Sequence, residues 1–246
     1  MTRPLVALVI PTLNEAEAIG GVIAAVPRAV VDDIIVVDSG STDRTVENAR
    51  AGGARIVGLR EHGYGRACRA GANAAQNCDI IVFLDGDGSD RPELIPLLVE
   101  PIADGRYDFV IGSRTRGERE RGSMAAHQLF AGWLIGGAMR LLYGVHYTDM
   151  CPFRAIRRDA LMRLPMREDT YGWNLEMQMR AARAGLRILE VPVAHRRRAG
   201  GTSKVSGNLR GTIMASWRIL ATFTRIAAER RERAPKAVTS AGRPLR

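Results

Sequence analysis

Three aspartates stand close together in the segment FLDGDGSD, residues 83–90, at the point where an apolar run ends. Asp85, Asp87 and Asp90 repel one another when ionised, and a carboxylate beside the apolar interior loses solvation. An acidic turn on a solvated edge would tolerate this spacing, whereas a divalent cation would make use of it. The segment by itself leaves both interpretations open, so the elements that position it must decide.

Four apolar runs predict strands that are buried on both faces, because none of them alternates between polar and apolar residues. These runs are LVALVI (5–10), DIIVVD (33–38), DIIVFLD (79–85) and DFVIGSR (108–114). Helical patterns lie between and after them, over residues 15–27, 42–51, 63–77 and 92–104. Such an alternation of strands and helices predicts an α/β fold with a mostly parallel sheet covered by helices on both faces.

Polar loops follow the first three predicted strands. Their sequences are PTLNE, DSGSTD and DGDGSD. Ligands of open α/β sheets bind outside the carboxyl ends of the strands, so we expect the three loops to open on one edge and form a site together. The first loop lacks the glycine fingerprint of a dinucleotide fold, and no Walker phosphate loop is present, which argues against a dehydrogenase or a P-loop enzyme.

Positive charge is concentrated at the carboxyl end of the chain. Residues 196–246 hold 13 Lys and Arg against 2 Asp and Glu, a net charge of +11, whereas residues 1–195 hold 23 against 24. Nucleic acid, an anionic membrane surface or a phosphorylated substrate would each explain the excess. Nucleic acid is disfavoured because the basic tail lacks interleaved aromatic residues for base stacking. We expect residues 231–246 to form a basic disordered tail.

Two further stretches predict helices. Residues 124–147 are apolar and predict a buried core helix, with packing on a membrane surface or in a homodimer as the alternative. Residues 206–230 predict an amphipathic helix that contacts an anionic bilayer or docks on its own domain, and we favour the bilayer. Its expected apolar face carries Ile213, Trp217, Leu220 and Ala227, and its expected basic face Arg210, Arg218 and Arg225.

Five segments occur in the order found in family 2 glycosyltransferases. They are VIPTLNEAEAI, IIVVDSGSTDRT, FLDGDGSDRP, IGSR and EVPVAHRRRAGGTSK. The chain resembles the branch of dolichol- or polyprenyl-phosphate sugar synthases, which includes mannosyltransferases, and this implies the GT-A fold. The resemblance covers about residues 5–205 and implies a catalytic domain over 1–205, followed by the helix 206–230 and the tail.

The resemblance implies a role for the acidic loop. Asp85, Gly86 and Asp87 resemble the family's Asp-x-Asp motif, which holds the diphosphate of a nucleotide-sugar through a divalent cation. Mg²⁺ or Mn²⁺ suits these hard oxygen ligands and would neutralise the leaving diphosphate. Many members carry Gln where this chain has Ser89, and we expect the Ser89 hydroxyl to reach the metal directly or through water. Asp87 is the expected principal metal ligand, and the expected catalytic residues are Asp87, Glu176 and Arg198.

Contacts to the nucleoside and the phosphates are also implied by the resemblance. Many members read Asp-Asp where this chain reads Asp38-Ser39, so the donor remains open between GDP-mannose and UDP-glucose. A solvated strand end is the alternative for the arginines around Arg198. The residues implied to contact the nucleoside are Pro11, Leu13, Glu15, Val37 and Asp38, and those implied to hold phosphates are Arg114, Arg198 and Lys204.

The acceptor side is implied to lie at two segments. WNLEMQ (173–178) supplies Glu176 as the carboxylate near the acceptor, and TDMCPFRAIRRDAL (148–161) supplies Asp149 and Arg154, which would otherwise form a buried pair. A phosphate monoester is largely dianionic at neutral pH, its second pKa being about 6, so it needs no general base. A hydroxyl acceptor would need a carboxylate within hydrogen-bond reach, and only Glu176 is available there.

The resemblance thus implies metal-dependent, inverting transfer of a hexose from a nucleoside diphosphate to a polyprenyl phosphate. Transfer to a soluble or cell-envelope hydroxyl, and binding of a sugar nucleotide without catalysis, are the alternatives. The start of the chain has no secretory pattern, and no stretch reaches the roughly 20 apolar residues of a membrane span. We therefore expect a cytoplasmic protein that associates peripherally with the inner face of the plasma membrane.

Overall fold

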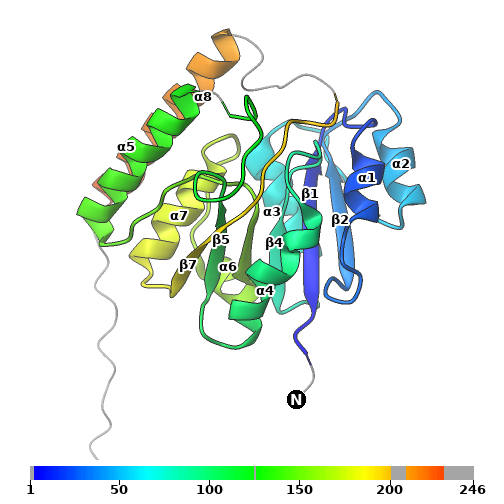
Figure 1. Cartoon of the computed structure of the whole chain (residues 1–246), viewed down its shortest axis with the longest axis horizontal. Helices are drawn as coiled ribbons and strands as arrows, with labels where there is room; N and C mark the ends of the chain where they lie inside the picture. Colours follow the sequence, from blue (N-terminus) through cyan, green and yellow to red (C-terminus); the bar gives the residue numbers. More distant parts are fainter. Residues whose placement is uncertain (1–2, 125, 201–208, 230–246) are drawn as a thin grey trace, which may run out of the picture.

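The computed structural model describes residues 3–124, 126–200 and 209–229. Its centre is a seven-stranded sheet of order β3-β2-β1-β4-β6-β5-β7, in which only β6 runs antiparallel to its neighbours (Figure 1). This arrangement confirms the α/β fold with a mostly parallel sheet. The strands are β1 (Val6–Thr12), β2 (Asp33–Asp38), β3 (Arg55–Gly58), β4 (Ile80–Phe83), β5 (Phe109–Ser113), β6 (Arg154–Arg157) and β7 (Ile188–Pro192).

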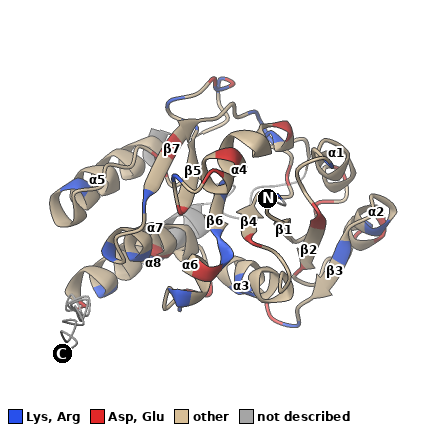
Figure 2. Ribbon diagram, turned by 90° about the horizontal axis from the view of Figure 1, so that it is seen from below, with Lys and Arg blue, Asp and Glu red and all other residues tan. Residues whose placement is uncertain are grey.

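Helices cover both faces of the sheet, with α1 and α4 on one side and α3 on the other (Figure 2). The helices predicted from the sequence are present but shorter than expected. They are α1 (Ile19–Ala24), α2 (Thr45–Ala51), α3 (Tyr64–Ala74), the 3₁₀ turn η1 (Pro92–Leu94) and α4 (Ile95–Ala103). The remaining helices are α5 (Ala126–Tyr143), α6 (Arg158–Arg163), α7 (Trp173–Arg183) and α8 (Leu209–Ala228).

Strand register brings the three polar loops together. In the parallel pair of β1 and β2, Thr12 lies opposite Asp38, and in the pair of β1 and β4, Val9 lies opposite Phe83. The three strands therefore end at the same edge of the sheet, as the sequence predicts. Helix α3 packs tightly beneath them, since a Cβ on Gly71 would lie only 2.3 Å from Val9 Cγ1.

Strands β3, β6 and β7 are not predicted from the sequence because each is short and carries charge. Asp108, just before β5, ties two of them together: it accepts hydrogen bonds from Arg187, before β7, at 2.8 and 3.0 Å and from Arg157 of β6 at 3.2 Å. The hydrogen bond from Arg187 is the largest cause that lowers the pKa of Asp108 to about 2.

We expect Asp108→Asn to lower the free energy of unfolding by about 1 kcal/mol at pH 7, after allowance for solvent screening. Because the folded-state pKa lies below the unfolded value of about 4, the contribution is complete above that pH and is lost as the pH falls through about 2. Urea unfolding at pH 7 and pH 2 checks this. An equal loss at both pH values would show that the charge of Asp108 is not responsible.

Helix α5 differs from the predicted buried core helix. Phe130, Trp133 and Leu141 are 62%, 71% and 88% exposed, although Met139 on the same helix is fully buried. The prediction is wrong for this face because an apolar composition does not reveal which side of a helix packs against the rest of the protein. Both views place α5 with α8 at the end of the molecule beyond α7 (Figures 1 and 2).

Helix α8 docks on α7 through one face and leaves an apolar face open. Thr222 and Ile226 are buried, whereas Trp217 is 68% exposed. Arg225 points inward to the carboxylate of Glu176, so the basic face predicted for this helix is not a uniform outward stripe. Among the described residues, no helix combines the length and the apolar character needed to cross a bilayer. The predicted tail, residues 231–246, lies outside the described part of the chain.

Candidate functional site

A cavity of about 350 Å³ opens at the carboxyl edge of the sheet, where β1, β2 and β4 end. Its walls come from the loops after these strands, the start of α3, the loop before α7 and the segment after β7. The residues that line it are Pro11, Thr12, Leu13, Glu15, Ser39, His62, Gly63, Tyr64, Ala67, Asp85, Gly86, Asp87, Thr170, Tyr171 and Arg198.

The acidic loop forms one wall of this cavity. Asp87 accepts hydrogen bonds through Oδ1 from the Ser89 amide at 2.8 Å and from the Ser89 hydroxyl at 2.6 Å. Asp85 accepts one through Oδ1 from the Tyr64 hydroxyl at 3.0 Å. The position between them leaves no room for a side chain, because a Cβ on Gly86 would lie 2.8 Å from Thr12 Cγ2. The two carboxylates are therefore held at the cavity by fixed partners.

Electrostatics at this loop are unfavourable in the absence of a cation. Burial, followed by the charges of Asp87 and Asp90, raises the pKa of Asp85 to about 8. A divalent cation would offset this repulsion, and the carboxylate and hydroxyl oxygens of Asp85, Asp87 and Ser89 have the chemistry that Mg²⁺ or Mn²⁺ prefers. The described residues contain no group of three His, Cys, Asp or Glu side chains placed to hold a metal. A cation held by these oxygens would need further ligands from substrate or water.

Arg198 reaches across the cavity to two of the predicted residues. It donates to Glu15 Oε1 at 2.8 Å and forms an ion pair with Asp87 Oδ2 at 3.1 Å. Its segment is tied to the acidic loop through backbone hydrogen bonds from Arg196 N to Ser89 O and from Ala199 N to Asp87 O, each 3.0 Å long. Arg198, Glu15 and Asp87 thus meet in space although they lie far apart in sequence. Lys204, predicted to act beside Arg198, lies outside the described residues.

The predicted nucleoside contacts divide into two groups. Pro11 and Leu13 line the cavity, as does Glu15. Val37 is fully buried within β2, and the carboxylate of Asp38 accepts hydrogen bonds from the backbone amides of Gly40 and Ser41. Val37 packs in the core and Asp38 stabilises the turn after β2, so neither is among the lining residues, and their contact with the nucleoside stays a prediction. Ser39 lines the cavity in their place.

Arg114 is placed differently from the prediction. It forms a two-pronged ion pair with Asp149 at 2.7 and 2.8 Å and does not line the cavity, so its charge is already compensated. Arg154 is fully buried and donates to the backbone oxygens of Cys151 and Asn174. The alternative of a buried Asp149–Arg154 pair is therefore wrong, since Arg114 is the partner of Asp149, and the acceptor-side role of the two residues stays a prediction.

Glu176 does not face the cavity. Its side chain is 0% exposed, and Oε2 accepts hydrogen bonds from the backbone amides of Arg167 and Glu168 at 2.9 and 2.6 Å. Oε1 accepts from Arg180 at 2.9 Å and from Arg225 at 3.3 Å. Its oxygens hold α7, α8 and the loop before α7 together, so this geometry gives no support to the predicted catalytic role, which stays a prediction.

Several cavity residues escape prediction from the sequence. They include His62 and Tyr64 at the start of α3, and Thr170 and Tyr171 before α7. The glycines around Tyr64 are the one signal that was available, because Gly63 has a positive φ of 154° and a Cβ on Gly65 would lie 2.3 Å from Glu168 O. No local pattern marks Thr170 and Tyr171, which reach the cavity through the packing of their loop against distant segments of the chain.

Comparisons with known proteins agree with this geometry. Residues 7–164 match the model of the glycosyl transferase family 2. An uncharacterised glycosyltransferase of Mycobacterium tuberculosis is 37% identical, over 89% of this chain and 100% of that protein. An undecaprenyl-phosphate mannosyltransferase of Micrococcus luteus is 32% identical, over 82% of this chain and 88% of that protein.

A solved structure shares the architecture. Glucosyl-3-phosphoglycerate synthase from Mycobacterium tuberculosis, in complex with Mn²⁺, UDP-glucose and phosphoglyceric acid, superposes with a TM-score of 0.75. It is 27% identical to this chain, and the match covers 91% of this chain and 80% of that one. The family model spans more than half of the chain, and the fold is that of GT-A glycosyltransferases. The chain therefore belongs to glycosyl transferase family 2 and is a glycosyltransferase.

Proposed function

We propose that this enzyme transfers a hexose, with inversion, from a nucleoside-diphosphate sugar to a polyprenyl phosphate. The observation that carries the acceptor class is the engagement of Glu176, which lies outside the cavity with both oxygens bonded. The carboxylates that line the cavity, Glu15, Asp85 and Asp87, belong to the nucleotide and acidic loops. Among the described residues, no other carboxylate lines the cavity to act as a base, whereas a phosphate acceptor is already anionic and needs none.

Residue roles follow from the walls of the cavity. Asp87, with Asp85 and Ser89 in support, would hold a divalent Mg²⁺ or Mn²⁺ ion, whose charge would neutralise the leaving diphosphate. Pro11, Leu13 and Glu15 contact the nucleoside. Arg198, which pairs with Glu15 and Asp87 in this structure, exchanges these partners for donor phosphates, and Lys204 acts with it as a second cation. GDP-mannose and UDP-glucose are the two donors to test.

A peripheral location at the inner face of the membrane accords with the surface of α5 and α8. Phe130, Trp133, Met214, Trp217 and Leu220 are exposed at one end of the molecule, and the chain after residue 196 carries the net positive charge. Amphipathic helices of this composition bind anionic bilayers. The naming of the Micrococcus luteus relative for undecaprenyl phosphate supports a lipid acceptor.

A second candidate is transfer to a small water-soluble acceptor. It is favoured by the structural match to glucosyl-3-phosphoglycerate synthase, whose complex contains phosphoglyceric acid. The two functions share the donor cavity and differ in what occupies the acceptor side.

A transfer assay separates the candidates. The purified full-length protein is incubated with Mn²⁺ or Mg²⁺, labelled GDP-mannose or UDP-glucose, and either a short polyprenyl phosphate or 3-phosphoglycerate. Label that enters the organic phase, and fails to do so with EDTA, supports the lipid acceptor and identifies the donor. Transfer to 3-phosphoglycerate alone would replace the lipid proposal with the second candidate.

Membrane association gives a separate prediction. We expect the double variant Trp217→Ser and Leu220→Ser to reduce partitioning onto vesicles of anionic lipid by about tenfold, because two large apolar side chains no longer enter the interface. Cosedimentation with vesicles measures this, and Leu97→Ser on α4 is the control, since Leu97 is exposed on another helix. Unchanged partitioning of the double variant would exclude α8 as a membrane contact.

A further inference from the structure

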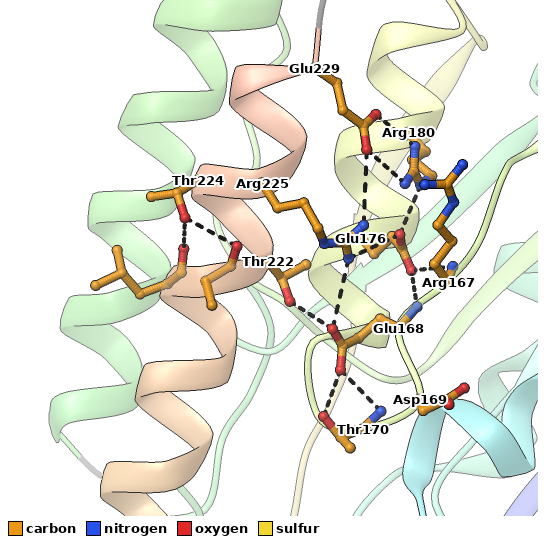
Figure 3. Close-up of polar contacts among 12 residues, drawn as sticks. Arg167, Glu168, Asp169, Thr170, Glu176, Arg180, Thr222, Thr224, Arg225 and Glu229 are labelled. Carbon is orange, nitrogen blue, oxygen red and sulfur yellow. Dashed lines mark hydrogen bonds and ion pairs between the residues drawn. The ribbon is translucent and has the colours of Figure 1, made fainter.

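The carboxylate of Glu168 joins helix α8 to the wall of the cavity. Glu168 Oε2 accepts a hydrogen bond from the Thr222 hydroxyl of α8 at 2.9 Å (Figure 3). Its other oxygen, Oε1, accepts from the amide and the hydroxyl of Thr170 at 3.1 and 2.6 Å. Thr170 and its neighbour Tyr171 line the cavity. One side chain therefore connects a buried residue of α8 to the surface that faces the substrate.

A second carboxylate holds the other end of the same loop. Glu176 accepts hydrogen bonds from the amides of Arg167 and Glu168, and it also accepts one from Arg225 of α8. Figure 3 shows Arg225 entering between Glu176 and Glu168, and its Nη2 lies 3.8 Å from Glu168 Oε2. Two carboxylates, Glu168 and Glu176, therefore position the loop over residues 167–171 between α7 and α8. Helix α8 donates a hydrogen bond to each of them, from Thr222 and from Arg225.

The loop has little freedom on its opposite side. A Cβ on Gly63 would lie 2.5 Å from Asp169 O, and a Cβ on Gly65 would lie 2.3 Å from Glu168 O. The amide of Arg66 donates to Asp169 O at 3.0 Å. Tyr64, which stands between the two glycines, donates to Asp85 of the acidic loop. A displacement of the loop would therefore shift the start of α3 and, through Tyr64, the position of the Asp-x-Asp motif.

We infer that Thr222 of α8 is a positioning residue for the active site: through Glu168 it holds Thr170 and Tyr171 against the donor cavity. Helix α8, which carries the exposed apolar face, thus supports the active site as well as the proposed contact with the membrane surface. The inference rests on the proposed function only in assigning the cavity to the donor. The hydrogen-bonded path itself needs no substrate.

Helix α8 offers a matched pair of variants for the test. Thr222→Val removes the hydroxyl that bonds Glu168 while nearly preserving volume, and Thr222→Ser restores a hydroxyl. Thr224→Val is the control, because the Thr224 hydroxyl donates only to the backbone oxygens of Leu220 and Ala221 in its own helix. Figure 3 shows Thr224 on the side of α8 away from Glu168.

Hydrogen exchange in the substrate-free, full-length protein is the first measurement. We expect Thr222→Val to speed the exchange of amides 167–171 by about threefold to tenfold, because a hydrogen bond to a charged group is lost. Thr222→Ser and Thr224→Val should exchange like the parent. Equal exchange of this loop in Thr222→Val and Thr224→Val would overturn the inference, whatever acceptor the enzyme uses.

Kinetics then separate positioning from a general loss of stability. We expect Thr222→Val to raise the KM for the sugar donor by about threefold to tenfold with kcat within about twofold, since the cavity wall is loosened while the chemistry is intact. A smaller folded fraction would instead lower the apparent kcat at an unchanged KM, and that result would overturn the inference. If the parent protein does not transfer hexose to polyprenyl phosphate, the proposed function is contradicted. The hydrogen-exchange result would still decide the role of Thr222.

Discussion

Asp87→Ala is expected to lower transfer by about a thousandfold or more while the protein remains folded. Asp87 lines the cavity, lies 3.1 Å from Arg198, and is the principal expected ligand of the divalent cation. Without the cation, the transition state loses several kcal/mol of electrostatic stabilisation. A loss of about 4 kcal/mol corresponds to a rate about a thousandfold lower. Initial rates with labelled donor at saturating Mn²⁺ measure the effect, and circular dichroism reports the fold.

Two further variants sharpen that experiment. Asp87→Asn keeps the oxygen that accepts from Ser89 but removes the charge, so it should be nearly as inactive as the alanine variant while keeping the loop in place. Asp104→Ala, at the exposed end of α4, should behave like the parent. An active Asp87→Asn would show that the charge of Asp87 is dispensable. Unfolding of both Asp87 variants would make the residue structural.

Glu176→Ala is expected to destabilise the protein by about 3–5 kcal/mol, a large share of the stability of a typical domain. The side chain is completely buried and bonds Arg180, which is only 4% exposed. Its removal leaves a buried guanidinium without its nearest partner on α7 and leaves the amides of Arg167 and Glu168 without an acceptor. Urea unfolding of the variant measures the loss, with the exposed Glu100→Ala on α4 as the control.

Glu176→Gln distinguishes this structural role from a catalytic one. A general base contributes about a hundredfold to ten-thousandfold to the rate, so its amide variant would be stable and inactive. We expect the reverse: a protein that is clearly less stable, whose folded fraction keeps kcat within about tenfold. A stable Glu176→Gln with a rate a thousandfold lower would restore Glu176 as the base and would favour a hydroxyl acceptor.

Local patterns were sufficient for the framework of the site. The apolar runs that become β1, β2, β4 and β5 report burial on both faces, and each ends in a loop whose chemistry can be read directly. Because parallel strands share one carboxyl edge, the meeting of Glu15 with the acidic loop followed from strand order. The short strands β3, β6 and β7 were not predictable in this way, since their few apolar residues are flanked by charged ones.

What the sequence by itself determined is the α/β fold, the family and the acidic loop with its carboxylate and hydroxyl oxygens. What only the tertiary structure decided is which charge pairs with which. Arg114 pairs with Asp149, and Glu176 pairs with Arg180 and Arg225. Glu168 joins α8 to the cavity wall. The physical reason is that burial and turn preferences are local properties of the chain. The partner of a charged side chain is chosen by packing between segments as distant as Glu168 and Thr222.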